Sequence, residues 1–395
     1  MERFTKIILK SGKEQSVRRY HPWIFSGAIK QIEGQPEEGD IVQVYSNKDE
    51  FLATGHYQIG SITVRIFSFE KILPGHDLWE QRITDAYRLR ESLGLTENAG
   101  TNVYRLVNAE GDAMPGLIID YYNGIAVMQI HTVGMYKIRE QLTDILKNIY
   151  GKRLKGVYNK SSSTMPFKAK IEVRNEYLYG NGNLETVTEN GIRFFVDWHE
   201  GQKTGFFIDQ RENRALLGAY ANNRKVLNMF CYTGGFSAYA MKGGASLVHS
   251  VDSSAPAIAM TEKNIHQNFA TAKNHQSYVT DASDYLVATK EKFNLIILDP
   301  PAFAKHLNVL DNALQGYKRL NMRALEIIES GGILFTFSCS QVVSKENFRK
   351  SVFAAAANTG RTVKILHQLA QPADHPVSIY HPEGEYLKGL VLYVE

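Results

Sequence analysis

Short apolar runs alternate with longer stretches of mixed polarity in the second half of the chain, a pattern typical of strands alternating with helices. The apolar runs cover residues 226–230, 246–251, 293–298 and 333–337. They carry almost no charge, as strands buried on both faces of a parallel sheet require. We therefore predict a parallel sheet whose strands end at one edge.

The first half of the chain has a different pattern. Residues 1–70 contain short strand-like runs, which suit a small β-barrel. The turn residues between these runs are Gly34, Gly39, Asn47 and Gly60. Further along, the periodicity predicts amphipathic helices over residues 77–93 and 136–149, and a hairpin that turns at 121–124. The stretch at 180–183, rich in glycine and asparagine, marks a boundary.

The first apolar run leads into a glycine-containing turn at residues 231–236, followed by a predicted helix. Such a turn lets the backbone approach a nucleoside at the carboxyl end of a parallel sheet. A dinucleotide site needs three small residues in G-x-G-x-x-G spacing, and Phe236 is too bulky for a pyrophosphate. S-adenosylmethionine has no phosphate and fits a single glycine pair. Asp252 ends the next run, where a carboxylate can accept both ribose hydroxyls. The alternative is an ordinary strand-turn-helix corner.

The two later runs end in residues that carry chemistry. Residues 293–298 stop at Asp299-Pro300-Pro301, where the prolines fix a rigid exit and aim the carboxylate at a flat heterocycle. The last run delivers Cys339 between two serines. C5 of a pyrimidine is a weak nucleophile, and a thiolate added at C6 converts the ring into an enamine-like nucleophile. Taken singly, a strand terminator and a buried small residue explain these positions; together they favour catalysis.

The ordered set of strand ends resembles the bacterial 23S rRNA cytosine-5 methyltransferase family of the large-subunit methyltransferase I type. Stretches along the whole chain carry the same resemblance. They are residues 21–27 (HPWIFSG), 109–117 (AEGDAMPGL), 201–211 (GQKTGFFIDQR), 316–318 (GYK), 373–377 (ADHPV) and 382–384 (PEG).

The resemblance implies three domains: a PUA-like RNA-binding β-barrel at residues 1–71, a central α+β domain at 72–185 and a Rossmann-like α/β methyltransferase domain at 186–395. It also implies S-adenosylmethionine as the donor, a cytosine of 23S ribosomal RNA as the acceptor, and a homodimer. Cys339 would be the nucleophile, with Asp299 as its catalytic partner. The base that removes the C5 proton is unassigned, and we interpret Cys231 as a packing residue.

We expect the donor to lie at the strand ends, covered by a hairpin over residues 191–211. Arg211 is placed to clamp the donor's carboxylate, although Asp209 as a helix cap is an equal alternative. Asp281 is placed like the carboxylate that reads the adenine amino group. The expected donor contacts are Phe207, Asp209, Gln210, Arg211, Asn228, Phe230, Tyr232, Thr233, Gly234, Gly235, Asp252, Ser253, Asn264, Asp281, Asp299 and Pro300.

Basic residues beside an aromatic residue near the N-terminus predict contact with RNA. The expected RNA-binding residues are Arg18, Arg19, His21, Trp23 and Lys203. The alternative is a solvated strand edge with Trp23 buried. The net charge of +4 is too small to indicate a nucleic-acid partner by itself.

Composition sets the broad class. With 395 residues, 44% hydrophobic and 22% charged, the chain is long enough for two or three globular domains. Two cysteines give no disulfide framework, and the N-terminus lacks a secretory signal, so we expect a cytoplasmic protein. No apolar run reaches the roughly 18 residues of a membrane span. The 12 histidines show no metal-ligand spacing, so we expect no metal.

Two functions of other classes stay open. One is an N-methyltransferase acting on a guanine or a protein amide, because Asp-Pro-Pro followed by an aromatic residue also serves exocyclic nitrogens and needs no thiol. The other is a non-catalytic RNA-binding assembly factor that keeps the donor site as a relic. Retention of the glycine pair, Asp252 and Cys339 in one chain argues against the relic.

Overall fold

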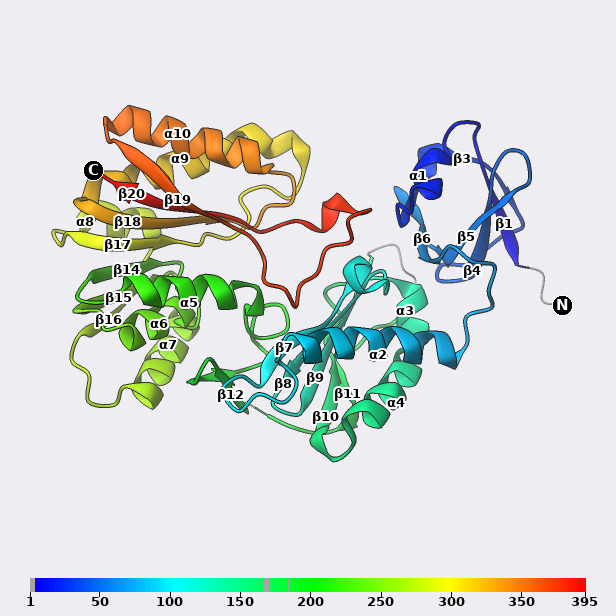
Figure 1. Ribbon diagram of the computed structural model, residues 1–395, viewed down its shortest axis with the longest axis horizontal. Helices are drawn as coiled ribbons and strands as arrows, with labels where there is room; N and C mark the ends of the chain where they lie inside the picture. The colour runs from blue at the N-terminus through cyan, green and yellow to red at the C-terminus, as the bar shows by residue number, and fades with distance from the viewer. Residues whose placement is uncertain (1–3, 167–170, 184) are drawn as a thin grey trace. The chain divides into compact units, whose positions relative to one another are not determined.

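The computed structural model describes residues 4–166, 171–183 and 185–395 (Figure 1). Two compact units make up the chain, and the chain passes between them several times. The first unit comprises the described residues of Met1–Val187, together with Val196–Ile208 and Ala373–Gly384. The second comprises Thr188–Phe195, Asp209–Pro372 and Glu385–Glu395. The predicted domain boundaries at 71/72 and 185/186 stay predictions.

A six-stranded sheet forms the N-terminal part of the first unit. In spatial order its strands are β2 (Trp23–Phe25), β6 (Ile62–Ser68), β5 (Phe51–Tyr57), β4 (Ile41–Tyr45), β1 (Thr5–Leu9) and β3 (Ile29–Glu33). Short helices α1 (Gln15–Arg18) and η1 (Ser26–Ala28) join the early strands. Alternate apolar side chains such as Ile7, Val42 and Val64 are fully buried and form one core. This confirms the short strands expected over residues 1–70.

A five-stranded sheet with helices forms the rest of the first unit. Its strands, in spatial order, are β11 (Glu176–Gly180), β10 (Gly156–Asn159), β9 (Ile125–Ile130), β8 (Leu117–Tyr122) and β7 (Val103–Asn108). Its helices are α2 (His76–Ser92), α3 (Val133–Lys137), α4 (Arg139–Tyr150), η2 (Ala109–Asp112) and η3 (Gly151–Arg153). Ile83 of α2 and Ile145 of α4 share a buried core with the strands. The hairpin predicted at 121–124 is confirmed, with Asn123 and Gly124 both at positive φ.

A seven-stranded sheet is the framework of the second unit. Its spatial order is β16 (His275–Val279), β15 (Leu247–Asp252), β14 (Lys225–Met229), β17 (Phe293–Leu298), β18 (Ile328–Ser338), β20 (Lys388–Val394) and β19 (Val363–Leu369). The first five strands are parallel, and β20 is antiparallel to both of its neighbours. The four apolar runs of the sequence all fall on central strands, so the predicted parallel sheet is confirmed.

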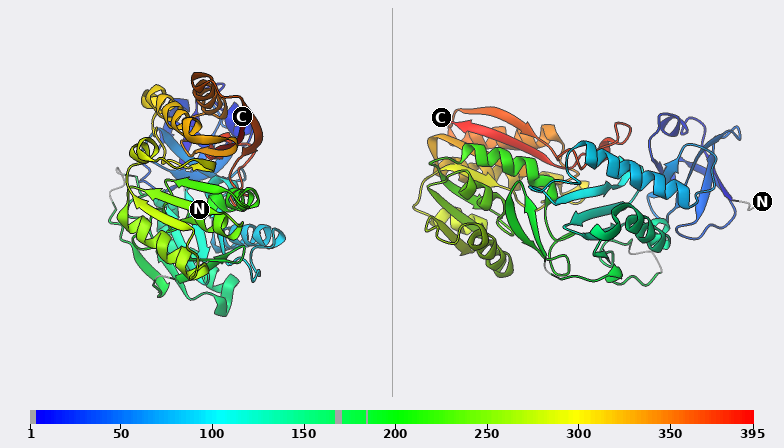
Figure 2. Two further views of the ribbon diagram at one scale, coloured as in Figure 1. Left: turned by 90° about the vertical axis from the view of Figure 1, so that its left-hand side faces the viewer. Right: turned by 60° about the horizontal axis from the view of Figure 1, so that its bottom comes forward.

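Helices cover both faces of this sheet (Figures 1 and 2). One group is α5 (Arg211–Tyr220), α6 (Gly235–Lys242) and α7 (Ala255–Asn268). The other is α8 (Ala282–Ala288), α9 (Leu310–Ile327) and α10 (Lys345–Thr359). Leu286, Leu325 and Val352 of the second group pack with strand residues in one buried cluster. Short turns η4 (Ile208–Gln210), η5 (Leu307–Val309) and η6 (Pro382–Gly384) complete the elements.

Two sequence predictions need correction. The hairpin expected over residues 191–211 is instead formed by β12 (Glu185–Glu189) and β13 (Ile192–Val196). Its turn is Asn190-Gly191, both at positive φ, which is the residue pair that a two-residue hairpin turn favours. The second predicted helix, at 136–149, is divided at Ile138 into α3 and α4.

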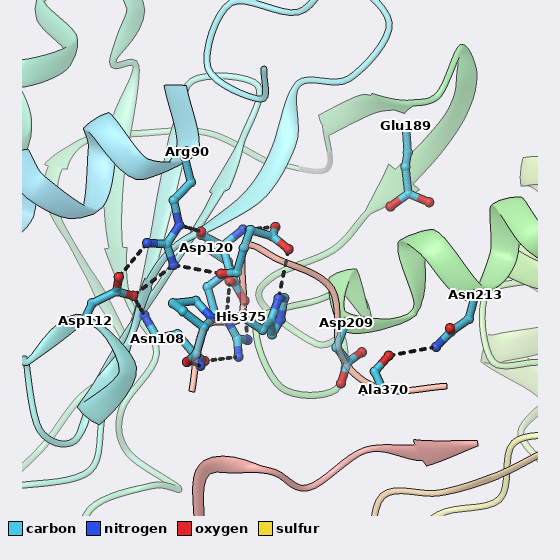
Figure 3. Close-up of polar contacts among 12 residues, drawn as sticks. Arg90, Asn108, Asp112, Asp120, Glu189, Asp209, Asn213, Ala370 and His375 are labelled. Carbon is cyan, nitrogen blue, oxygen red and sulfur yellow. Dashed lines mark hydrogen bonds and ion pairs between the residues drawn. The ribbon is translucent and has the colours of Figure 1, made fainter. Parts of the chain in front are cut away.

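A buried arginine ties residues 373–384 into the first unit (Figure 3). Arg90 of α2 is fully buried and makes a two-point ion pair with Asp112, at 2.6 and 2.8 Å. Its guanidinium also donates to the backbone carbonyl of Asp374 at 2.7 Å. A Cβ atom at Gly111 would lie 1.9 Å from the carbonyl of Pro376, so the backbones touch here. The 373–377 stretch singled out in the sequence is therefore an anchor point.

Removing Arg90 should destabilise the first unit. Because Arg90→Met leaves the buried Asp112 carboxylate without its cation, we expect a loss of about 3–5 kcal/mol in unfolding free energy. All three tryptophans (Trp23, Trp79 and Trp198) lie in the first unit, so urea unfolding followed by tryptophan fluorescence measures it. Arg88→Met on the same helix is the control: Arg88 and Asp85 form an exposed pair, and the expected change is below about 0.5 kcal/mol. Equal effects of the two substitutions would contradict the anchoring role.

Candidate active site

The carboxyl ends of the parallel strands meet at one edge of the seven-stranded sheet. Met229 of β14 is in register with Val251 of β15 and Leu298 of β17, and Leu298 is in register with Thr336 of β18. The residues that follow these positions are therefore neighbours in space. At this edge lie the turn at 230–235, Asp252, Asp299 and Cys339. They come at the ends of four different strands, as the sequence pattern predicted.

The turn after β14 brings backbone close to the sheet edge. Gly234 has φ of 79°, and a Cβ atom there would lie 2.7 Å from Thr261 of α7. Phe230 and Tyr232 also have positive φ. Asn228, on the strand before the turn, is buried and donates to Ser237 at 2.9 Å. The chain is held in this shape from α7, where Thr261 donates to the carbonyl of Tyr232 at 2.8 Å.

Asn264 of α7 supports the turn through both ends of its side-chain amide. It donates to the carbonyl of Thr233 at 2.8 Å and accepts from the backbone N–H of Phe195, also at 2.8 Å. Its hydrogen bonds thus join the turn at 230–235 to strand β13. The sequence predicted that Asn264 contacts the methyl donor, and that contact stays a prediction. The structure shows that Asn264 positions the turn.

The buried ion pair of Arg214 and Glu189 lies beside this turn. Arg214 of α5 meets Glu189 at 2.7 and 2.9 Å. Tyr239 of α6 also donates to Glu189 at 3.0 Å. A Cβ atom at Gly235 would lie 3.0 Å from Cδ of Arg214, so a larger residue would crowd the Arg214 side chain. None of these residues except Gly235 was singled out in the sequence, because an isolated Glu or Arg carries no signal of its partner.

Two aspartates at the edge are fixed by hydrogen bonds from the chain itself. Asp252, the last residue of β15, accepts from the backbone N–H groups of Tyr232 and Ser254, each at 2.9 Å. Each carboxylate oxygen keeps a further lone pair, so the group is oriented yet able to accept more. The neighbouring Ser253 is exposed. Asp281 follows β16, is exposed, and caps α8 by accepting from Ser283 at 2.7 Å.

Asp209 and Asp299 lie close enough for their charges to interact, and Arg214 offsets only part of that repulsion. Asp299 accepts from Gln210 at 3.1 Å, and Asp209 accepts from Tyr386 at 2.7 Å. The other oxygen of Asp209 is buried and has no hydrogen-bond partner among the described residues. Burial, and then the charge of Asp209, raise the pKa of Asp299 to about 7. Gln210 is itself held by Asn213 at 2.6 Å, and Asn213 also donates to Ala370 (Figure 3).

Cys339 lies beside the Asp-Pro-Pro exit, with its Sγ 3.9 Å from the carbonyl oxygen of Pro300. The serines on either side of it are buried and anchored: Ser338 donates to the hydroxyl of Tyr317 at 2.9 Å, and Ser340 donates to the carbonyl of Ala304. Burial, followed by the charges of Asp299 and Asp209, raises the pKa of Cys339 to about 11. In the free protein the thiol is therefore protonated near neutral pH.

Cys231 lies in the turn at 230–235, in an environment that differs from that of Cys339. It is buried, and its Sγ lies 3.8 Å from the hydroxyl of Thr261. Burial raises its pKa to about 12. This environment is that of a packed side chain, in agreement with the interpretation from sequence.

The remaining predicted donor contacts are placed as follows. Arg211 is the first residue of α5 and is buried, and its role as a carboxylate clamp stays a prediction. Phe207 belongs to the first unit, as does Lys203, which is exposed with φ of 52°. Asp209 does not cap α5, because the N-cap residue is Gln210 and no side chain caps that helix.

The expected RNA-binding residues of the N-terminal sheet differ in whether other side chains of the protein already contact them. Trp23 donates to Glu110 at 2.7 Å, and the Arg65 guanidinium lies 5.0 Å from its ring centre. His21 has Glu383 within 3.3 Å of its Nε2. Arg18 is ion-paired with Glu50, while Arg19 is exposed. Contact of these residues with RNA stays a prediction.

One group among the described residues has the spacing of metal ligands: His76, Asp77 and Glu80, at the start of α2. Such acidic groups near the surface are common without an ion, and the expected lack of a metal stays a prediction. No helix in the described part of the chain is both long and apolar enough to cross a membrane.

The sheet edge fits S-adenosylmethionine on two counts. Asp252, beside the glycine turn, is oriented with spare acceptor capacity for the ribose hydroxyls. The donor carries a sulfonium and an ammonium, which complement the acidic pair of Asp209 and Asp299. An isolated buried carboxylate is expensive, and a cationic ligand relieves that cost.

Comparison with known proteins agrees with this geometry. A family model described as a PUA-like domain matches residues 7–69, and one described as S-adenosylmethionine-dependent methyltransferase matches residues 162–380. Among solved structures, a Streptococcus mutans protein assigned to the SAM-dependent methyltransferases is 24% identical, with a TM-score of 0.84 over 98% of this chain and 99% of its own. A methyltransferase complexed with SAH is 25% identical, with a TM-score of 0.85 over the same shares.

Curated relatives match the chain from end to end. Ribosomal RNA large subunit methyltransferase I of Photobacterium profundum is 39% identical, covering 99% of this chain and 100% of its own length. The protein of the same name from Pseudoalteromonas atlantica is 40% identical, covering 99% of each chain. The chain therefore belongs to the S-adenosylmethionine-dependent methyltransferases, in the family of ribosomal RNA large subunit methyltransferase I.

Proposed function

We propose that the protein methylates C5 of a cytosine in 23S ribosomal RNA through a covalent adduct with Cys339. The observation that carries the proposal is the position of the thiol. Its sulfur lies 3.9 Å from the Pro300 carbonyl oxygen, at the sheet edge that also holds the turn at 230–235. The names of the relatives support ribosomal RNA of the large subunit as the substrate. The expected homodimer remains a proposal as well.

The chemistry needs a nucleophile because C5 of cytosine is too weak to attack the donor. The Cys339 thiolate adds to C6, and the electron pair of the C5–C6 double bond becomes available at C5. C5 attacks the methyl group of S-adenosylmethionine; as the bond to C5 forms, the bond from the methyl carbon to the sulfonium sulfur breaks, and S-adenosylhomocysteine leaves. Loss of the C5 proton to a base then restores the double bond and expels the thiolate, so the enzyme is regenerated. The base for this proton is unassigned.

Asp299 is suited to hydrogen-bond the edge of the cytosine ring. Burial raises the pKa of its carboxyl to about 7 in the free protein, and the cationic donor favours the ionised form once it is bound. The carboxylate can then accept a hydrogen bond from the exocyclic amino group of the cytosine and hold the ring beside Cys339 as the thiolate adds.

Direct transfer to an exocyclic nitrogen is the second candidate. It would use Asp299 and the carbonyls of the Asp-Pro-Pro exit and would need no thiol. Ser338 and Ser340 favour the mechanism that uses the thiol, because their hydrogen bonds hold Cys339 in one position at the edge. A small packing residue has no need of two such anchors.

Donor binding should be coupled to a proton. Because the pKa of Asp299 is raised to about 7, its carboxyl is largely protonated at about pH 6, and a bound cation favours the ionised form. Binding at about pH 6 should release up to about one proton, and affinity should fall as the pH drops below 7; at about pH 8 the coupling should vanish. Calorimetry in buffers of different ionisation enthalpy counts the protons. Asp299→Asn should lose the coupling, and proton release unchanged in that variant would refute the assignment.

Cys339→Ala should abolish turnover and leave donor affinity within about twofold, because the thiol acts on the acceptor. RNA with 5-fluorocytosine at the target should trap the wild-type protein as a denaturation-resistant adduct, since fluorine cannot leave as a proton. Cys231→Ala is the matched control and should still form the adduct. Methylation by Cys339→Ala, with an N-methylated base as product, would favour direct transfer instead.

A further inference from the structure

A buried lysine lies directly behind the proposed nucleophile. Lys388 is the first residue of β20 and is only 6% exposed. It is in register with Ser338 of β18, the residue before Cys339. Its Nζ donates to the backbone carbonyl of Ser340, the residue after Cys339, at 2.6 Å. The ammonium therefore lies against residues 338–340, the short segment that contains Cys339.

The position of Lys388 is fixed by the strand that carries it. The next residue, Gly389, is in register with Phe337, and a Cβ atom at Gly389 would lie 2.6 Å from the Phe337 ring. Only glycine leaves space for that ring, so the start of β20 lies tightly against the end of β18. The Lys-Gly pair places the ammonium behind the thiol segment.

Lys388 and Lys160 are buried cations that donate to a backbone carbonyl, whereas some other buried cations have carboxylate partners. Arg90 and Arg214 each make a two-point ion pair with a buried carboxylate. In the part of the chain that the structure describes, no carboxylate oxygen lies within 4 Å of Nζ of Lys388, and its single hydrogen bond goes to a carbonyl. Burying an ammonium without a counterion is costly. Stability of the fold alone does not explain a lysine here, where an apolar residue would pack without that cost.

We infer that Lys388 is a positioning residue for Cys339: its ammonium fixes the carbonyl of Ser340 and supplies the positive charge that stabilises the thiolate when it forms. This inference rests on the proposed function of Cys339 as nucleophile. Lys388 acts through the thiol and needs no contact with RNA or donor.

The charges around the thiol agree with this role. Asp299 after β17 and Asp209 of η4 raise the pKa of Cys339, whereas Lys388 lowers it. Tyr317 of α9 also faces the thiol, and burial raises the pKa of that phenol to about 12. Lys388 is thus the cation that opposes two carboxylates at this position.

Lys388 is itself sensitive to pH. Burial lowers its pKa to about 8, with Lys345 acting in the same direction and with Cys339 and Glu385 opposing it. The ammonium is therefore charged near neutral pH, and a neighbouring thiolate favours that charged form. The thiol and the amine titrate as a coupled pair.

The test measures the reactivity of Cys339 in the full-length protein without RNA or donor. Alkylation by iodoacetamide is followed from about pH 7.5 to 10 by mass spectrometry of the Cys339 peptide. The variants are Lys388→Met, which removes charge and hydrogen bond, Lys388→Gln, which keeps a donor, and Lys388→Arg, which keeps the charge. Lys345→Met is the control, because Lys345 is exposed and paired with Glu385.

We expect alkylation at about pH 7.5 to slow about three- to tenfold in Lys388→Met and Lys388→Gln, as a thiol pKa raised by about half to one unit requires. Lys388→Arg and Lys345→Met should stay within about twofold of wild type. Equal rates in the Gln and Arg variants would overturn the inference, and this comparison decides even where Lys388→Met does not fold. The alkylation result is independent of methylation: if Cys339→Ala still methylates RNA, the proposed function fails while the effect of Lys388 on the thiol remains measurable.

Discussion

The parallel alignment of neighbouring strands in the second unit is the constraint on which the candidate site depends. Strands β15, β14, β17 and β18 run in one direction and in register, so the residues after them share one edge. A slip of one residue in any strand would turn its side chains to the opposite face. Apolar side chains such as Leu227, Ile296 and Phe335 are fully buried in this register.

The charge at this edge follows from burial. The charges of Asp209 and Asp299 repel each other and are only partly offset by Arg214, and burial raises the pKa values of both Asp299 and Cys339. The free protein therefore holds a proton on its thiol and an excess of negative charge. A cationic donor and the ammonium of Lys388 both oppose that excess. In this account, donor binding and activation of the thiol are linked through the same two carboxylates.

The sequence was sufficient for local features and for the order of the strands. The Asn123-Gly124 turn and the strand ends at Asp252 and Asp299 were predicted because each depends on a few adjacent residues. It was insufficient where a role depends on a partner far along the chain. Lys388 lies behind Cys339 because β20 pairs with β18, and no local pattern indicates that pairing. Residues 373–384 belong to the first unit although they lie between two strands of the second, because Arg90 and neighbouring backbone hold them.

The identity of the methylated base tests the central claim most directly. Large-subunit ribosomal RNA that lacks the modification would be incubated with the protein and with S-adenosylmethionine labelled in its methyl group, then digested to nucleosides and separated. If Cys339 adds to C6 of a cytosine, the label appears in 5-methylcytidine. Label in an N-methylated guanosine, with none in 5-methylcytidine, would contradict the account.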